Sequence, residues 1–452
     1  MTGSPPLAGR SALWTGPWPA EDGGPCRTQL AAGLPALRIG PEERLETTAI
    51  RDAFGATMVV LRDPGEVYAL RHTLGRRPLR DPVTAWVERI DPVTLAPLAR
   101  SQQLAGGPFW PGGLAAHANG SLYVVSGNHC HRLSADLDLL ATARLPAGRP
   151  YNSFVVLGDG TLCTKDFDRE LGSESRLVAL DPDTLERLGA EGGIGEPSIG
   201  RLSAAGNDVY VVGASSVQRW RWDGSALERD GAWGAPYLIP GGSYGWDPVI
   251  AGGHVWFLDN GAHDFVTTMR GAGVAGGPVH LVRLSLSDPG DFERVEVCGL
   301  PRGAITNPPL YDASRRVAVA YDSANGVVQA FSFGERLSPL WRRELSHAAH
   351  MILYPESGEL VLHDFKGRAL FHTRLGRALG RRTAGAVRHE ALRRRATRLS
   401  RDEVVVVDIE TGSERGRAPV PTLMQSVVFP APGFDRDLYW VTMSTIARIA
   451  VV

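Results

Sequence analysis

The chain has 452 residues, 43% of them hydrophobic, and a formal net charge of −1, so it can bury a large core and has no general electrostatic bias toward nucleic acid or membranes. No apolar run approaches the roughly 20 residues that span a bilayer, and the first residues lack the charged and apolar regions of a signal peptide. The four cysteines are widely spaced with no CxxC pair, which indicates neither a zinc site nor a disulfide framework, and we expect a cytoplasmic protein without membrane contact.

The first 34 residues form an extension that precedes the repetitive part of the chain. They are rich in proline, glycine and tryptophan. We expect them to drape over the folded domain with Trp14 and Trp18 as anchors, and the sequence assigns them no further role. The folded domain itself is expected to span residues 35–452.

From Ala56 onward the chain repeats a unit of short apolar strands separated by tight turns. Examples are GLAAHANGSLYVVSG from Gly113, FVVLGDGTLCTKD from Phe154 and MILYPESGELVLHDF from Met351. The strands are β-branched and aromatic, and pairs such as NG, DG and GG mark the turns. Eight copies of about 50 residues match the size of a four-stranded blade. We therefore predict an all-β chain folded as a single eight-bladed β-propeller, with seven blades as the alternative if the first copy packs irregularly.

The last copy ends at Val452 after only three strands. A blade with a missing outer strand would expose unpaired backbone groups along its edge. We predict that an N-terminal strand around Leu45 to Ile50 completes this blade and closes the ring.

Two phrases of the chain, RLVALDPDTLERL from Arg176 and VVVVDIETGSE from Val404, resemble the repeats of the PQQ-repeat (quinoprotein-like) and YVTN-type propellers. The resemblance covers the repeats from Ala56 to the end and implies the propeller architecture, but a fold alone does not imply a function. The adjacent cysteines and the tryptophan-docking signature of PQQ dehydrogenases do not occur in this sequence. We therefore expect no organic cofactor.

Ligand sites on rigid scaffolds are built from loops, and in a propeller such loops meet at one mouth of the central channel. This mouth receives the residues just before each inner strand and the loops between the second and third strands. The residues just before the inner strands are mostly polar or aromatic, and we predict that they bind a ligand. They are Trp110, Tyr151, Asn152, Trp246, Asp247, Asn307, His350 and Gln425. The alternative is that these positions are polar only because channel mouths are wet.

The loops between the second and third strands contain carboxylates and both lysines of the chain. In three copies an aspartate follows the leading residue of the second strand by four positions, at Asp166, Asp259 and Asp364. Asp322 lies close to the same place, and Lys165 and Lys366 are the only two lysines among 48 basic residues. A buried lysine, unlike arginine, can lose its proton and act as a base. The predicted catalytic set comprises His350, the two lysines and the first three aspartates, Asp166, Asp259 and Asp364, although aspartate is also an ordinary turn former.

Residues 366–401 form a long insertion with the only clear helical signal of the chain. From Arg368 to Arg401 they carry 11 arginines and a single acid, Glu390. Over the channel mouth such a segment would act as a lid, an anion-attracting rim or a docking arm for a protein partner, and the alternative is a solvated loop. Aromatic residues that would stack on bases are nearly absent from it, so a nucleic-acid role is not expected.

Two functions from different classes remain open, and we favour the first. It is a cofactor-independent enzyme of small-molecule metabolism, a lyase, isomerase, cyclase or hydrolase, that binds an organic ligand at the channel mouth and uses acid–base chemistry. The second is a non-catalytic scaffold that presents the same face to a protein partner. A calcium-dependent, lactonase-like hydrolase is a further alternative, because Asn152, Asn307 and Asp247 are residue types that bind calcium.

Overall fold

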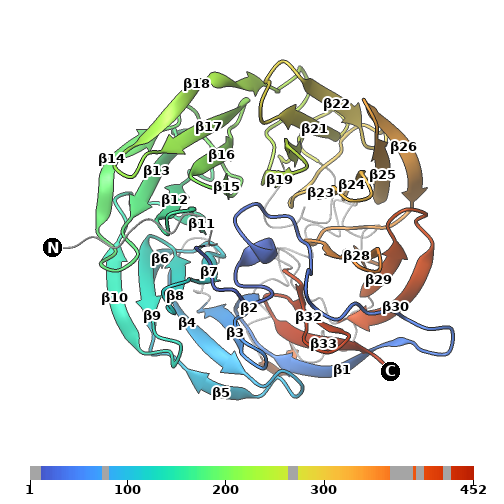
Figure 1. The fold of residues 1–452 in the computed structure, drawn as a ribbon, viewed down its shortest axis with the longest axis horizontal. Coiled ribbons are helices and arrows are strands. Elements are labelled where there is room, and N and C mark those ends of the chain that lie inside the picture. The colour runs from blue at the N-terminus through green and yellow to red at the C-terminus, as the bar shows by residue number, and fades with distance from the viewer. Residues whose placement is uncertain (1–11, 74–80, 263–272, 367–389, 393–401, 421–428) are drawn as a thin grey trace.

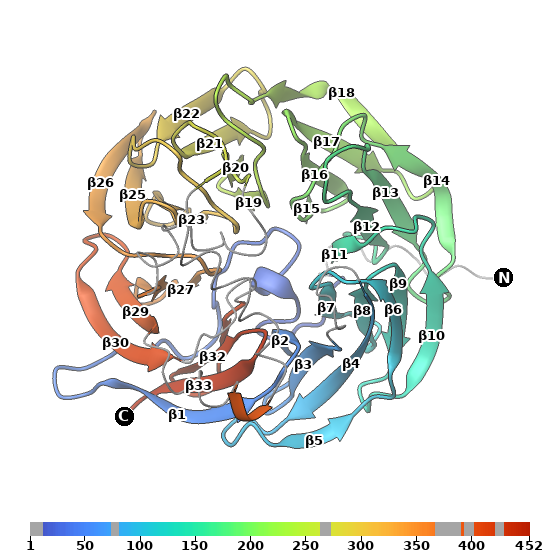
Figure 2. The ribbon, with the colours of Figure 1, turned by 180° about the vertical axis from the view of Figure 1, so that it is seen from behind.

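The strands of the protein form eight sheets arranged as blades around a central axis (Figure 1). The structure is a computed structural model that describes residues 12–73, 81–262, 273–366, 390–392, 402–420 and 429–452. Figure 2 shows the same ring from behind, with the outer strands at its rim. The prediction of an eight-bladed β-propeller is confirmed.

Each blade runs antiparallel from an inner strand at the channel to an outer strand at the rim. The inner strands are β2 (Ala56–Leu61), β7 (Gly113–Ala116), β11 (Tyr151–Val156), β15 (Ser203–Ala205), β19 (Val249–Ala251), β23 (Leu310–Asp312), β27 (Ile352–Tyr354) and β31 (Ala431–Pro432). The second strands are β3 (Val67–His72), β8 (Leu122–Ser126), β12 (Leu162–Asp166), β16 (Asp208–Val212), β20 (His254–Leu258), β24 (Val317–Asp322), β28 (Glu359–Asp364) and β32 (Asp437–Val441).

The third strands are β4 (Pro82–Ile90), β9 (His129–Leu133), β13 (Arg176–Leu180), β17 (Ser216–Trp222), β21 (His280–Ser285), β25 (Val327–Phe333), β29 (Asp402–Asp408) and β33 (Thr445–Val451). The outer strands are β5 (Pro97–Arg100), β10 (Leu139–Arg144), β14 (Arg187–Gly193), β18 (Leu227–Pro236), β22 (Phe292–Glu296), β26 (Leu337–Arg343), β30 (Glu414–Val420) and β1 (Leu45–Asp52). An additional strand, β6 (Leu104–Pro108), pairs with β4 in the first blade.

The burial of a strand depends on its distance from the rim. All five residues of β8 are buried, because neighbouring blades cover both faces of a second strand. The outer strand β10 instead alternates between half-buried and exposed residues. This difference explains why the inner parts of each repeat read as apolar runs in the sequence.

The N-terminal strand closes the ring as predicted. β1 pairs antiparallel with β33, with Leu45 opposite Val451 and Asp52 opposite Thr445. It thereby becomes the outer strand of the blade formed by β31, β32 and β33, and no blade in the described part of the chain lacks its fourth strand.

Residues 12–37, called here the N-terminal segment, enter the channel, whereas the sequence suggested a segment that drapes over the disc. Trp18 is 2% exposed and pairs with Leu61 at the end of β2. Further along, the carbonyl of Pro25 accepts the N–H of Ala204 in β15, and Leu30 pairs with Leu353 in β27. The segment thus lies inside the ring against the inner strands of several blades.

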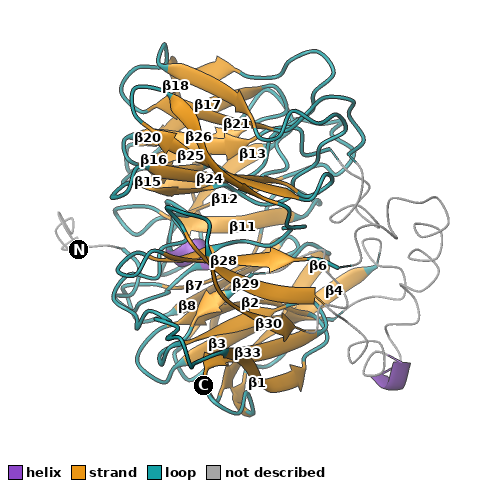
Figure 3. Ribbon diagram, turned by 90° about the vertical axis from the view of Figure 1, so that its right-hand side faces the viewer, coloured by secondary structure: helices purple, strands orange, loops and turns teal. Residues whose placement is uncertain are grey.

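Helical structure is scarce in the described residues. The 3-10 helix η1 (Glu21–Gly23) belongs to the N-terminal segment and lies within the thickness of the ring, as the edge-on view in Figure 3 shows. Of the arginine-rich insertion only residues 390–392 are described beyond Lys366, and they are helical. None of the described helices is both long and apolar enough to cross a bilayer.

Candidate functional site

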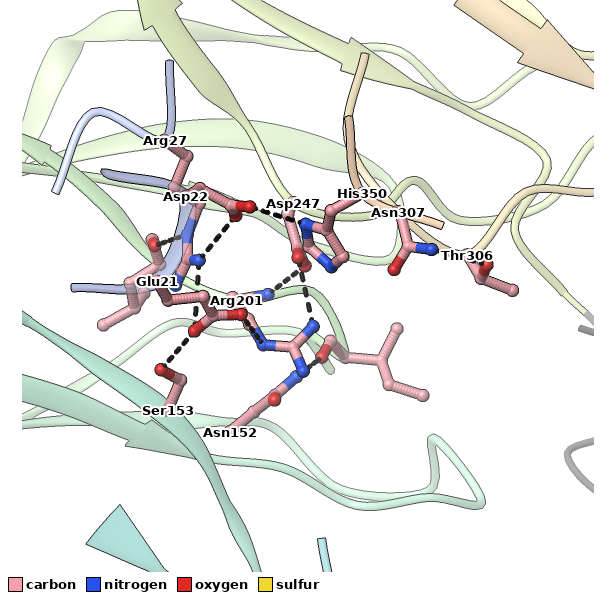
Figure 4. A network of polar contacts seen from close by, with 12 residues as sticks. Glu21, Asp22, Arg27, Asn152, Ser153, Arg201, Asp247, Thr306, Asn307 and His350 are labelled. Carbon is pink, nitrogen blue, oxygen red and sulfur yellow. Dashed lines mark hydrogen bonds and ion pairs between the residues drawn. The ribbon is translucent and has the colours of Figure 1, made fainter. Parts of the chain in front are cut away.

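A network of buried charged side chains fills the channel where the N-terminal segment meets the inner strands (Figure 4). The segment contributes two acids from η1 and one arginine, and the connections that lead into β15, β19 and β27 each contribute one residue. The members are Glu21, Asp22, Arg27, Arg201, Asp247 and His350, and each is at most 6% exposed. We call this group the channel cluster.

Glu21 lies at the centre of the contacts in the channel cluster. Its Oε2 accepts a hydrogen bond from Ser153 Oγ at 2.7 Å and lies 3.2 Å from Nη1 of Arg27. Its Oε1 lies 2.7 Å from Nε of Arg201, and Nη1 of Arg201 lies 3.2 Å from Oδ2 of Asp247. Buried charges are tolerated when they are paired in this way.

His350 and Asp22 form a pair at the edge of this network. Nδ1 of His350 lies 2.7 Å from Oδ1 of Asp22, and Oδ2 of Asp22 lies 3.1 Å from Nη1 of Arg27. Burial alone would raise the pKa of Asp22, but the charges and hydrogen bonds of His350, Arg27 and Arg201 hold it below its ordinary value. An ionised carboxylate can only accept a hydrogen bond, so Nδ1 carries the hydrogen.

The other ring nitrogen of His350, Nε2, has no hydrogen-bond partner among the residues that the structure describes. Nε2 is buried, and the ring of Phe429 covers the imidazole at a centroid distance of 4.2 Å. The channel cluster contains the three carboxylates of Glu21, Asp22 and Asp247 and the two guanidinium groups of Arg27 and Arg201, so the imidazole faces an excess of negative charge. This geometry leaves Nε2 free to exchange a proton with another molecule.

The channel cluster also contains the one group of potential metal ligands found among the described residues. Glu21, Asp22 and His350 each place a ligand atom within 4.8 Å of the others. However, Arg27 contacts both carboxylates and Arg201 contacts Glu21. Because these guanidinium groups occupy the carboxylate oxygens and repel a cation, the donor set does not fit a metal ion.

The residues that suggested calcium binding are similarly engaged within the protein. Oδ1 of Asn152 accepts a hydrogen bond from Nε1 of Trp110 at 2.7 Å. Oδ1 of Asp247 accepts the backbone N–H of Arg201 at 2.5 Å, and its Oδ2 pairs with the guanidinium group of the same residue. These oxygens do not form a free coordination shell.

Four residues of the predicted binding set lie together at the channel cluster. Figure 4 shows Asn152, Asp247, Asn307 and His350 around the same centre. Nδ2 of Asn307 donates to the carbonyl of Ala348 at 3.1 Å, so its amide also links two neighbouring blades. Gln425 lies outside the described residues.

The three predicted aromatic residues instead pack into the protein interior. Trp110 packs edge-on against Phe167 at a centroid distance of 4.6 Å. The hydroxyl of Tyr151 accepts the N–H of Ala147 at 3.0 Å, and Nε1 of Trp246 donates to a backbone carbonyl. All three side chains are buried, which is typical of core residues rather than of a ligand surface.

The predicted catalytic aspartates are not brought together, and each stabilises its own blade. Oδ1 of Asp166 accepts the N–H of Arg176, the first residue of β13, at 2.6 Å. Oδ1 of Asp259 accepts the N–H of His280, the first residue of β21, at 2.7 Å. Asp364 accepts the N–H of Ser346 at 3.2 Å. These contacts agree with the turn-forming role considered above as the alternative.

The two lysines have opposite environments. Nζ of Lys366 is hydrogen-bonded to Asp364 and lies 2.9 Å from Oε2 of Glu403, and 40% of its side chain is exposed. Lys165 is completely buried, and its Nζ donates to the carbonyl of Ser198 at 2.6 Å. Nothing in the sequence distinguishes the two lysines. In the structure Lys366 forms an ion pair at the surface, whereas Lys165 is a buried amine.

Sequence reasoning missed four members of the site for two different reasons. Arg201 precedes β15 at the position that provided candidates in other blades, so the same rule would have found it. Glu21, Asp22 and Arg27 belong to a segment without repeats or periodicity, and no pattern indicated that they enter the channel.

No family model matches the chain, and no curated protein matches it in sequence. In structure it is similar to a europium-containing methanol dehydrogenase, with a TM-score of 0.56 and 10% identity over 94% of this chain and 89% of the other. BamB from Moraxella catarrhalis matches with a TM-score of 0.47 and 12% identity over 82% and 95%. A streptogramin B lyase matches with a TM-score of 0.42 and 10% identity over 75% and 92%. The likeness concerns the fold alone, and the protein is an eight-bladed β-propeller that resembles the PQQ-repeat type in architecture.

Proposed function

We propose that the protein is an enzyme of small-molecule chemistry in which His350 transfers a proton at the centre of the channel. The observation that carries the proposal is that Nε2 of this buried histidine has no hydrogen-bond partner among the described residues, while Nδ1 is held by Asp22. Buried polar groups are rarely left unsatisfied, and a catalytic role is one physical reason for an exception. A ligand atom at Nε2 would supply the missing partner.

In this proposal Asp22 is a positioning residue. By accepting the Nδ1–H of His350 at 2.7 Å it selects the tautomer whose Nε2 lone pair can remove a proton from a ligand. The imidazolium that results is stabilised by the carboxylate, and it can return the proton to another atom of the same ligand. Removal and return of a proton is the chemistry of lyases, isomerases and cyclases. Arg27 supports it by keeping Asp22 ionised.

The N-terminal segment determines the direction of access. Because it lies against the inner strands and contributes Glu21, Asp22 and Arg27 to the channel cluster, we infer that a small organic ligand enters from the side of the ring away from it. The europium of the methanol dehydrogenase has no counterpart in the proposal, because Arg27 and Arg201 bind the carboxylates that such an ion would need. A cytoplasmic location remains part of the proposal.

A ligand screen on matched histidine variants tests this function. We expect a library of small carboxylic acids, ketones, lactones and sugars to contain a compound that raises the melting temperature of the wild type but not of His350→Gln. His72→Gln is the control, because His72 is 1% exposed yet uses both nitrogens, Nε2 toward Pro111 and Nδ1 toward Ser126. The control should keep the full shift. Compounds that stabilise all three proteins equally, or no stabilising compound at all, would argue against the proposal.

A further inference from the structure

Asn307 lies beside the stretch of chain that leads to His350, and the orientation of its side-chain amide is fixed. Nδ2 of Asn307 donates to the carbonyl of Ala348 at 3.1 Å and to Oγ1 of Thr306 at 3.2 Å. Because a carbonyl oxygen only accepts hydrogen bonds, this end of the amide is the nitrogen. The other end is the oxygen, and Figure 4 shows it on the side of the amide that is turned from Thr306 toward the channel cluster.

Oδ1 of Asn307 is a second acceptor in the channel that the protein itself does not use. In the part of the chain that the structure describes, no hydrogen bond is made to this atom, and Asn307 is 6% exposed. Nε2 of His350 belongs to the buried polar atoms without a partner, whereas Oδ1 of Asn307 does not. Solvent therefore reaches the amide oxygen, and a small molecule that approaches His350 from this side can donate a hydrogen bond to it.

The charges around these two acceptors disfavour a negatively charged ligand. The channel cluster holds three carboxylates but only two guanidinium groups, and each guanidinium group already contacts two of the carboxylates. Neither arginine therefore offers an uncompensated positive charge to an anion, and a fourth carboxylate would be repelled in this buried site. The ligand that fits is uncharged and offers a hydrogen to each of the two acceptors.

We propose that Asn307 determines the specificity of the channel by accepting a hydrogen bond from the hydroxyl group of an uncharged α-hydroxy carbonyl compound. This inference rests on the proton transfer proposed for His350 and adds the class of its substrate. The hydroxyl group donates to Oδ1 of Asn307, while Nε2 of His350 removes a proton from the carbon atom that bears the hydroxyl group. The adjacent carbonyl group takes up the electron pair of the broken C–H bond as an enolate, and the imidazolium then returns the proton.

Three small compounds test this specificity. Hydroxyacetone carries the required hydroxyl group, methoxyacetone lacks the hydrogen of that group, and glycolate keeps the hydroxyl group but is an anion. Their dissociation constants are measured by saturation-transfer NMR at pH 8, where Lys165 adds little positive charge beside Asp247, because burial lowers the pKa of this lysine to about 7. We expect hydroxyacetone to bind about tenfold more tightly than either of the other two compounds, the effect of one lost hydrogen bond or of one repelled charge.

A leucine variant removes the proposed acceptor. Asn307→Leu should bind hydroxyacetone and methoxyacetone with equal affinity, whereas a purely structural role of the amide would lower the stability of the variant and leave the ratio of the two affinities unchanged. Asn128→Leu is the matched control, because Asn128 is 4% exposed and its Nδ2 donates to the carbonyl of Ala147 at 3.3 Å, outside the channel cluster. The control should keep the preference of the wild type.

Deuterium uptake from D2O at the carbon that bears the hydroxyl group separates this inference from the proton transfer itself. We expect the wild type to catalyse the uptake into hydroxyacetone and His350→Gln to have no such activity. Uptake that depends on His350 but proceeds equally well with methoxyacetone would overturn the role of Asn307 and leave the proton transfer standing. A hydroxyl preference that persists in Asn307→Leu, tighter binding of glycolate, or no binding of hydroxyacetone would also overturn this role. Equal uptake with the wild type and His350→Gln would refute the proton transfer and, with it, this substrate class.

Discussion

At the scale of single residues, burial has different consequences for side chains that look equivalent in the sequence. Asp166 and Asp259 are buried, and each is engaged by a backbone N–H group and by a charged side chain, Arg149 for Asp166 and His280 for Asp259. Among the described residues, buried His350 has one nitrogen without a hydrogen-bond partner, and buried Lys165 has one neutral acceptor. The sequence identified all four as candidates by residue type and position. It could not separate them, because the partners of His350 and Lys165 lie in the N-terminal segment and in a connection between blades, which the repeat pattern does not reveal.

The burial of Lys165 predicts a stability effect with a defined dependence on pH. Its pKa of about 7 in the folded state is below the ordinary value, so between pH 7 and pH 10.4 the unfolded chain binds the proton and the folded chain does not. This favours unfolding as the pH falls through that window. Lys165→Met removes the effect, and we expect a gain on the order of 4 kcal/mol at pH 7 that disappears near pH 10.

Guanidinium chloride unfolding of the wild type and Lys165→Met at both pH values measures this gain. A variant that is less stable than the wild type at pH 7 would show that the amine is charged and satisfied in the folded protein.

At the scale of elements, the N-terminal segment differs most from the sequence-based expectation. The blades were predictable because strand alternation and glycine turns repeat along the chain. The segment has no such pattern, and it is held by single backbone bonds to several inner strands, such as Pro25 to Ala204, which leave no trace in the sequence. Its tryptophans did indicate anchoring, and the structure shows Trp18 buried and Trp14 bonded to Asp63. Its path into the channel could not be predicted.

The segment is expected to contribute strongly to the stability of the ring. Trp18 is 2% exposed and packs in the core with strands of the first, seventh and eighth blades, so Trp18→Ala should destabilise the protein by roughly 3–5 kcal/mol. Trp14→Ala is the matched control, because Trp14 is only half-buried, and it should destabilise the protein clearly less. Denaturant unfolding of both variants measures the difference. Equal effects would mean that the segment is not anchored through Trp18.

At the scale of the whole molecule, the ring brings together residues that are hundreds of positions apart. β1 closes the last blade on β33, and this closure was predictable from a missing fourth strand in the final repeat. Closure also places Asp22 beside His350, although the two residues are 328 positions apart. The sequence predicted that His350 faces the channel axis together with Asn152, Asp247 and Asn307. It did not predict that the protein fills this axis with its own acids and arginines.

The central claim is that the free nitrogen of His350 is where a ligand binds. Long-range ¹H–¹⁵N spectra of the protein labelled at its 12 histidines, with and without a compound found in the screen, test it most directly, and His350→Gln assigns the signals. We predict that the compound shifts the Nε2 resonance of His350 while the Nδ1 hydrogen stays bonded to Asp22. If the compound binds and the signals of His350 do not move while those of another histidine do, the claim is wrong.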